Sequence, residues 1–223
     1  MLDQEIVDGI IDIDKYLNAN FKILWILREA RDEGQISKET GANKKGGWNL
    51  TSNFYKNAAL KTVMKTLTTR RVLLAASAIL SDKKEDLDAF KSLAFINVKK
   101  FPGSKTAYKK EIESAVEKNK KLLTKQITAY EPEIIITGYV LHHLSSILSY
   151  QEGVKVKLGI SKTHHYFCFK DKLFINSFHP SNKIYKNGIY EQKYISTMAD
   201  AVKYWQENKD SFPVYKQASF DTK

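Results

Sequence analysis

The chain has 223 residues, 43% of them hydrophobic, so we expect one folded domain over residues 1–223 rather than a disordered chain. Its one cysteine, Cys168, excludes a disulfide framework, a zinc site built from cysteines and an iron–sulphur cluster held by four cysteines. The net charge of +11 favours a polyanionic partner, because each neutralised phosphate releases counterions, although a solvated lysine-rich surface explains the same charge.

Hydrophobic patterning divides the chain into alternating helices and strands. Helices are predicted where apolar residues recur every three or four positions, and strands where short apolar runs are bounded by polar or turn-forming residues. In chain order the sequence predicts a helix over 1–20, a strand over 22–27, a polar loop over 33–52, helical structure over 53–80, a strand over 92–98, a helix over 107–130, a strand over 131–138, a helix over 139–150, an aromatic stretch at 164–169, a strand over 171–178 and a helix over 191–209.

This alternation predicts an α/β fold, which we expect to be a three-layer α/β/α sandwich around a mainly parallel, four-stranded central sheet. In such sheets a ligand binds outside the carboxyl ends of the strands. The residues that follow the four predicted strands are therefore the candidate site residues. They are the segment 28–32, then Asn97 with Lys99 and Lys100, then Gly138 and Tyr139, and finally Asn176 with His179, Pro180 and Ser181.

Four segments around these positions read, in chain order, "ILWILREARDEG", "AFINVKKFPGSK", "EPEIIITG" and "LFINSFHPSNK". Their order and content resemble the uracil-DNA glycosylase superfamily, which has an acidic or amide-bearing loop, a strand ending in asparagine, a later glycine-terminated strand and a last strand running into His-Pro-Ser. The resemblance covers roughly residues 22–183. It implies an enzyme that flips a uracil or modified pyrimidine out of DNA and hydrolyses its N-glycosidic bond, in repair or in defence against phage DNA.

The first segment departs from the family pattern. The stretch 28–32, Arg-Glu-Ala-Arg-Asp, stands where the family has a motif such as Gly-Glu-Ala-Pro-Gly. Ala30 therefore occupies the position at which several branches carry a water-activating Asp or Asn. The cluster cysteines of the iron–sulphur branch are absent too, so we expect no cluster and no other cofactor.

The resemblance assigns His179 to stabilising negative charge on the departing base, and a side-chain amide such as that of Asn97 suits the Watson–Crick edge of a pyrimidine. Glu29 and Asp32 are the candidates for positioning water or stabilising the sugar cation. Each of these residues also has a purely structural alternative: the histidine caps a turn, the asparagine satisfies turn backbone, and the carboxylates pair with neighbouring arginines.

Further residues complete the expected site. We expect Phe54, Tyr139 and Asn176 to contact the base, with Tyr55 and Trp48 as alternative stacking residues. The expected DNA-phosphate contacts share a positive charge or a hydroxyl group near a strand exit. They are Arg28, Lys99, Lys100, Lys105 and Ser181.

The tandem pairs His142-His143 and His164-His165 invite a metal hypothesis, which we reject because no carboxylate or cysteine lies at a recognisable ligand spacing. We expect a monomer that binds DNA and no membrane, since no apolar run approaches ~20 residues. The acidic start of the chain lacks signal-peptide features, which favours a cytoplasmic protein. Two other functions remain open: a glycosylase-fold protein that binds nucleic acid without cleaving it, and a hydrolase of free nucleotides or nucleosides.

Overall fold

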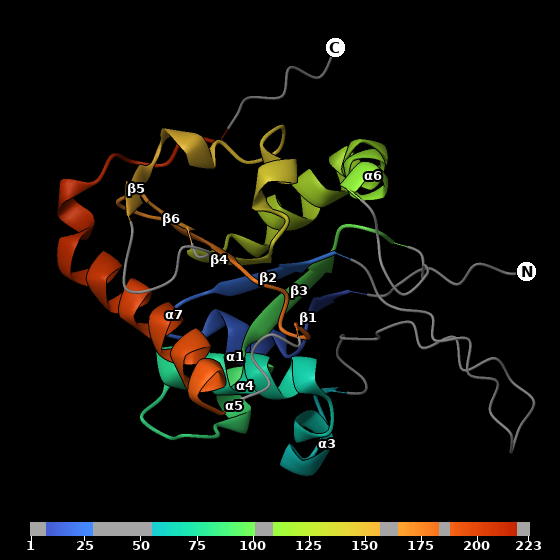
Figure 1. The fold of residues 1–223 in the computed structure, drawn as a ribbon, viewed down its shortest axis with the longest axis vertical. Helices are drawn as coiled ribbons and strands as arrows, with labels where there is room; N and C mark the ends of the chain where they lie inside the picture. Colours follow the sequence, from blue (N-terminus) through green and yellow to red (C-terminus); the bar gives the residue numbers. More distant parts are fainter. Residues whose placement is uncertain (1–7, 29–54, 101–108, 157–164, 183–187, 218–223) are drawn as a thin grey trace, which may run out of the picture.

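The computed structural model describes residues 8–28, 55–100, 109–156, 165–182 and 188–217 (Figure 1). Within these ranges the chain forms a mixed α/β fold around one seven-stranded sheet of order β1-β3-β2-β4-β7-β6-β5. The strands are β1 (Gly9–Ile10), β2 (Ile23–Leu27), β3 (Leu93–Asn97), β4 (Ile134–Gly138), β5 (Val154–Val156), β6 (His165–Cys168) and β7 (Leu173–Ser177). The helices are α1 (Ile13–Leu17), α3 (Leu60–Met64), α4 (Leu67–Leu80), α5 (Leu87–Lys91), α6 (Lys109–Tyr130) and α7 (Gly188–Asn208), with short 3-10 turns η1 (Leu141–Leu144), η2 (Tyr150–Glu152) and η4 (Lys209–Ser211).

The centre of the sheet consists of the four strands that the sequence predicts. β3, β2, β4 and β7 are mutually parallel, and every one of their residues is buried. Continuous apolar runs of this kind are typical of parallel strands covered on both faces. The expected total of four strands is wrong, because β1, β6 and β5 extend the sheet with antiparallel pairings. These three strands are short or only partly buried, so they lack the apolar signal of the central four.

Successive residues of the central strands face two separate cores. In β2, Ile23, Trp25 and Leu27 belong to one buried cluster, whereas Leu24 and Ile26 belong to the other. Residues of α4, α5 and α7 complete the first cluster, and residues of α6 and η1 complete the second. Figure 1 shows α4, α5 and α7 on one side of the sheet and α6 on the other. A strand places alternate side chains on opposite faces, so each central strand contributes to both cores. Helices cover both of these faces.

The helix predictions have mixed outcomes. Those over 107–130 and 191–209 are confirmed by α6 and α7, and helical structure over 53–80 is confirmed in its described part by α3 and α4. The helix over 1–20 is wrong in its described part, where β1 precedes a helix of only five residues capped by Asp12. The helix over 139–150 is also wrong, because that segment forms the 3-10 turns η1 and η2. Among the described helices, none combines the length and apolar character needed to cross a membrane.

A buried ion pair fixes the chain beyond the end of β3. The Nζ of Lys100 lies 2.6 Å from Oδ2 of Asp8, and both side chains are at most 3% exposed. Gln126 of α6 donates to Oδ1 of Asp8 at 2.8 Å and accepts from Lys100 at 2.9 Å. The backbone N–H of Asn97 donates to the same Asp8 carboxylate at 2.7 Å. One carboxylate therefore joins the segment before β1, the exit of β3 and helix α6.

We predict that Asp8→Ala lowers the free energy of unfolding by about 3–5 kcal/mol, because it leaves the buried Lys100 ammonium without its counter-charge. The measurement is urea unfolding followed by circular dichroism. Lys15→Ala serves as the control, since Lys15 pairs with Asp88 at the surface, where side-chain exposures are 37% and 70%, and its loss changes stability by at most about 1 kcal/mol. Equal effects of the two variants would contradict a structural role for the buried pair.

Candidate active site

The carboxyl ends of the four parallel strands lie side by side in the order β3, β2, β4, β7. Asn97 is in register with Leu27, and Gly138 is in register with Ser177. The pairing of β2 and β3 continues past the strands, since the N–H of Lys99 donates to the carbonyl oxygen of Arg28 at 2.9 Å. The structure thus brings the ends of the predicted segments to one edge of the sheet.

His179 packs directly against the end of β4. A Cβ atom added at Gly138 would lie 3.1 Å from Cδ2 of His179 and 3.3 Å from Cδ2 of Leu27. Contacts this short are tighter than those normally seen for a side-chain carbon, so the glycine makes room for the imidazole. The imidazole therefore occupies the same corner of the sheet as the ends of β2 and β4.

Hydrogen bonds set the protonation pattern of this imidazole. The backbone N–H of Ser181 donates to Nδ1 of His179 at 3.2 Å, and the Ser181 hydroxyl oxygen lies 2.8 Å from the same nitrogen. A nitrogen that accepts from a backbone N–H carries no proton, so in the neutral ring the proton is on Nε2. Nε2–H is thus a hydrogen-bond donor that the loop orients through the other ring nitrogen.

Arg71 of α4 holds the loop that contains His179. Its side chain is 1% exposed, and its Nη1 donates to the carbonyl oxygens of Pro180 and Asn182, both at 2.7 Å. Its Nε donates to Oε2 of Glu191 in α7 at 2.9 Å. The hydroxyl of Tyr194, also in α7, donates to the carbonyl oxygen of Phe178 at 3.0 Å. Two helices therefore fix the loop on both sides of the histidine.

Glu191 is the counter-charge for this arrangement. Burial alone raises the pKa of its carboxyl, but hydrogen bonds and charge from Arg71 and Arg70 outweigh burial and lower the pKa below its ordinary value. Arg70 reaches the same oxygen, Oε2, at 2.6 Å. The carboxylate therefore stays ionised at neutral pH and keeps the buried guanidinium of Arg71 compensated.

Asn97 presents an unpaired amide at this edge. Its side chain is 1% exposed, and its Nδ2 has no hydrogen-bond partner among the residues that the structure describes. Buried amide groups in folded proteins are nearly always hydrogen-bonded, so this donor at a strand exit is a candidate group for binding a ligand. By strand alternation Asn97 shares the face of Phe95 and Leu27, which is the face on which Gly138 meets His179.

Asn176 belongs to the other face of the sheet. It alternates with Ile175 and shares the side of Phe174, whose cluster is the one covered by α6. Its Oδ1 accepts a hydrogen bond from the hydroxyl of Thr137 at 2.9 Å. The structure does not bring Asn176 together with Asn97, and we therefore leave it out of the proposed base-binding residues.

Tyr139 follows Gly138 in an unusual backbone conformation. Its φ is +64°, a region that glycine and asparagine favour and that costs other residues about 1–3 kcal/mol. The residue is 42% exposed, and its ring stacks on that of Phe178 with a centroid separation of 5.7 Å. The guanidinium of Arg28 lies 5.8 Å from the centre of the Tyr139 ring. Strain of this kind is concentrated at functional positions.

The other predicted residues have different outcomes. Lys99 pairs with Glu111 at 3.2 Å, beside the strand exits. Lys100 points into the protein toward Asp8 and is 3% exposed, so its predicted contact with DNA phosphate is withdrawn. Ser181 bonds the imidazole of His179. Five predicted residues lie outside the described residues: Glu29, Asp32, Phe54, Lys105 and the alternative stacking residue Trp48.

His142 and His143 lie close to the strand exits. Their ring centroids are 3.7 Å apart, and Nδ1 of His143 lies 3.6 Å from a Glu113 carboxylate oxygen. Within the described ranges no group of three or more potential metal ligands is present. Burial, followed by nearby positive groups, lowers the pKa of His142; burial, followed by the neighbouring His142, lowers that of His143. Both rings are therefore neutral at pH 7.

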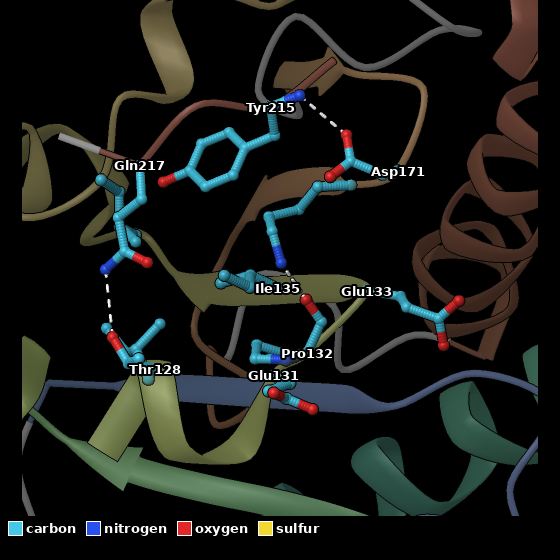
Figure 2. A pocket seen from close by; sticks show the side chains of 11 residues that line it. Thr128, Glu131, Pro132, Glu133, Ile135, Asp171, Tyr215 and Gln217 are labelled. Carbon is cyan, nitrogen blue, oxygen red and sulfur yellow. Dashed lines mark hydrogen bonds between the residues drawn. The ribbon is translucent and has the colours of Figure 1, made fainter. Parts of the chain in front are cut away.

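A separate cavity of about 490 Å³ lies at the opposite end of the sheet, where β4 and β7 begin (Figure 2). Some of its polar groups bond one another: Tyr215 N–H donates to Asp171 at 2.7 Å, and Gln217 donates to Thr128 at 3.2 Å. Lys172 donates to the carbonyl oxygen of Pro132 and lies 5.4 Å from the Tyr215 ring centre. These contacts fasten the C-terminal segment to the sheet, far from the residues that carry the candidate chemistry.

Neither a scan against protein-family models nor a search of curated proteins found a match for this chain. A functional assignment therefore depends on the residues at the strand exits. Arg71 and Asp8 are the important residues that sequence reasoning missed. Their partners are 120 and 92 positions away in the chain, so a single sequence carries little signal for either.

We predict that Arg71→Met lowers the free energy of unfolding by about 2–5 kcal/mol, because it removes one hydrogen bond from Glu191 and takes the Arg71 donor from the carbonyl oxygens of Pro180 and Asn182. Urea unfolding measures the loss. Arg70→Met is the matched control, since the Arg70 side chain is 38% exposed and its pair with Glu191 is worth at most about 1 kcal/mol. A control as damaging as Arg71→Met would show that loop anchoring is not specific to Arg71.

The histidine pair predicts a pH dependence of stability. Because the pKa of each ring is lower in the folded protein than the ordinary 6.5, the unfolded chain binds protons first as the pH falls. The two neutral rings make their full contribution to the free energy of unfolding above about pH 6.5, and this contribution declines as the pH falls below that value. Urea unfolding at pH 7 and pH 5 should show a smaller decline for a His142→Asn, His143→Gln double variant; an unchanged decline would contradict the assignment.

Proposed function

We propose that this protein is a DNA glycosylase of the uracil-DNA glycosylase superfamily, which excises uracil or a modified pyrimidine and leaves an abasic site. The observation that carries the proposal is the imidazole of His179, whose Nδ1 accepts from the N–H of Ser181, so that in the neutral ring the proton lies on Nε2. The Nδ2 of Asn97, which has no hydrogen-bond partner among the described residues, lies on the same face at the same end of the sheet. An Nε2–H donor and a side-chain amide are groups that can hold a carbonyl-bearing base.

In the proposed reaction the nucleotide leaves the base stack, which costs a few kcal/mol, and its base enters between the strand exits. Asn97 hydrogen-bonds the edge of the base. As the bond between the sugar carbon and the base nitrogen breaks, its electron pair moves onto the base, and Nε2–H of His179 stabilises the charge on a base oxygen. The oxygen of a water molecule then bonds to the sugar carbon.

The proton of that water passes to a carboxylate in the segment that follows β2. Glu29 and Asp32 are the proposed groups, and a carboxylate there also stabilises positive charge developing on the sugar. Ala30 replaces the family's water-activating residue, so this chain uses a different acidic position from several branches. The excess of 36 Lys and Arg over 25 Asp and Glu supports DNA as the partner, because phosphates supply most of the non-specific affinity.

The test is a panel of single- and double-stranded oligonucleotides that carry uracil, other deaminated bases, or hydroxymethylated or glucosylated pyrimidines, treated with the protein and then with alkali. We predict strand breaks at one base type. His179→Ala should lower the excision rate by about 100- to 1000-fold, the usual effect of removing one oxyanion donor. Asn97→Ala should lower it as well, by weakening the hold on the base.

Asn208→Ala is the matched control for the amide substitution, because the side-chain amide of Asn208 donates to the carbonyl oxygen of Tyr204 within its own helix, away from the strand exits. It should leave excision unchanged. Intact strands across the whole panel would overturn the proposal. DNA binding that survives His179→Ala without any abasic product would indicate a non-cleaving binding protein, and turnover of free nucleosides would indicate a monomer hydrolase.

A further inference from the structure

Four planar groups gather beside His179 at the exits of β2, β4 and β7. The Tyr139 ring lies nearly parallel to that of Phe178, at 5.7 Å and 12°, and edge-on to that of His142 at 5.8 Å. The Arg28 guanidinium lies 5.8 Å from the Tyr139 ring centre. Phe178 directly precedes His179, and Tyr139 directly follows the glycine that His179 touches. The cluster is therefore a neighbour of the proposed reaction centre.

Core packing accounts for Phe178, which packs against the first buried cluster, but not for Tyr139. Tyr139 is 42% exposed. Among the described residues, the other large hydrophobic side chains with this degree of exposure are aliphatic. It keeps a φ of +64°, in a backbone region that a bulky side chain rarely adopts. The Nε of Arg28 is buried and has no hydrogen-bond partner among the described residues. An exposed ring held in a strained conformation beside an unpaired arginine nitrogen points to a ligand rather than to folding.

We propose that Tyr139, Phe178 and Arg28 form a stacking subsite for an unpaired nucleobase adjacent to the excised one. Aromatic rings and guanidinium planes bind bases through their π faces and accept any base sequence. A base within an intact duplex is already stacked on both sides, so the subsite favours single-stranded or locally opened DNA. This inference rests on the proposed function, because that function supplies the excised base. Binding of the neighbouring base itself requires no bond cleavage.

The backbone of Tyr139 allows a sharp test. Glycine and asparagine accept positive φ, so Tyr139→Gly and Tyr139→Asn remove the ring and relieve the backbone together. We predict that their affinity for a single-stranded oligonucleotide without a target base falls about 5- to 150-fold, the effect of losing one stacked base. Their melting temperature should stay the same or rise. Tyr139→Phe should keep both properties of the parent protein.

Fluorescence anisotropy with single-stranded and duplex oligonucleotides, measured at several salt concentrations, gives the affinities. The slope of affinity against salt should be unchanged in Tyr139→Asn, because stacking releases no counterions. Glu131→Gly is the control for backbone relief, since Glu131 has a φ of +46° at the other end of β4. It should preserve single-strand affinity. Unchanged single-strand affinity in Tyr139→Asn, or a fall in its melting temperature, would overturn the subsite.

This experiment separates the subsite from the proposed chemistry. Single-strand binding that depends on Tyr139, without excision from any oligonucleotide, would support the subsite and contradict the glycosylase. Excision that is equally fast in the parent and in Tyr139→Asn, on single strands and on duplexes, would contradict the subsite and support the glycosylase.

Discussion

The candidate site depends on the buried guanidinium of Arg71. A positive charge with 1% exposure is tolerated only when it is paired and hydrogen-bonded, and Glu191 and the carbonyl oxygens of Pro180 and Asn182 meet that requirement. Because these partners come from α7 and from the loop after β7, one side chain of α4 joins that loop to both helices, and Tyr194 of α7 holds the loop on the other side of His179. The orientation of His179 follows from the position of the loop.

Much of the fold was predictable from hydrophobicity alone. β2, β3, β4 and β7 are buried on both faces and therefore appear in the sequence as unbroken apolar runs, and α6 shows a clear helical period. The sequence did not predict the edge strands, which are short and partly exposed. The segment 139–150 has apolar residues at helical spacing, but it forms 3-10 turns after the left-handed residue Tyr139. Conformations of single residues such as this one leave no periodic signal.

The location of the candidate residues was predictable where position along a strand determines it. Asn97, Gly138 and His179 were expected at strand exits, and parallel pairing alone brings those exits to one edge. The prediction of a residue's contacts failed where those contacts depend on the direction of its side chain. Lys100 turns inward to Asp8 because a buried carboxylate lies within 2.6 Å, and Asn176 faces the opposite side of the sheet from Asn97 because strand residues alternate. Such outcomes depend on contacts distant in sequence.

The two outermost strands of the sheet, β1 and β5, have a consequence for assembly. An exposed edge strand offers unpaired backbone groups to another chain, and proteins blunt such edges with short strands and charged residues. Here the outer strands are β1, with two residues, and β5, with three residues that include Lys155. Neither strand gives a second copy more than a few backbone groups to pair with. Pairing of two copies edge to edge through the described residues of β1 and β5 is therefore disfavoured, which leaves the helical faces of the described chain as the larger surfaces for contact between copies.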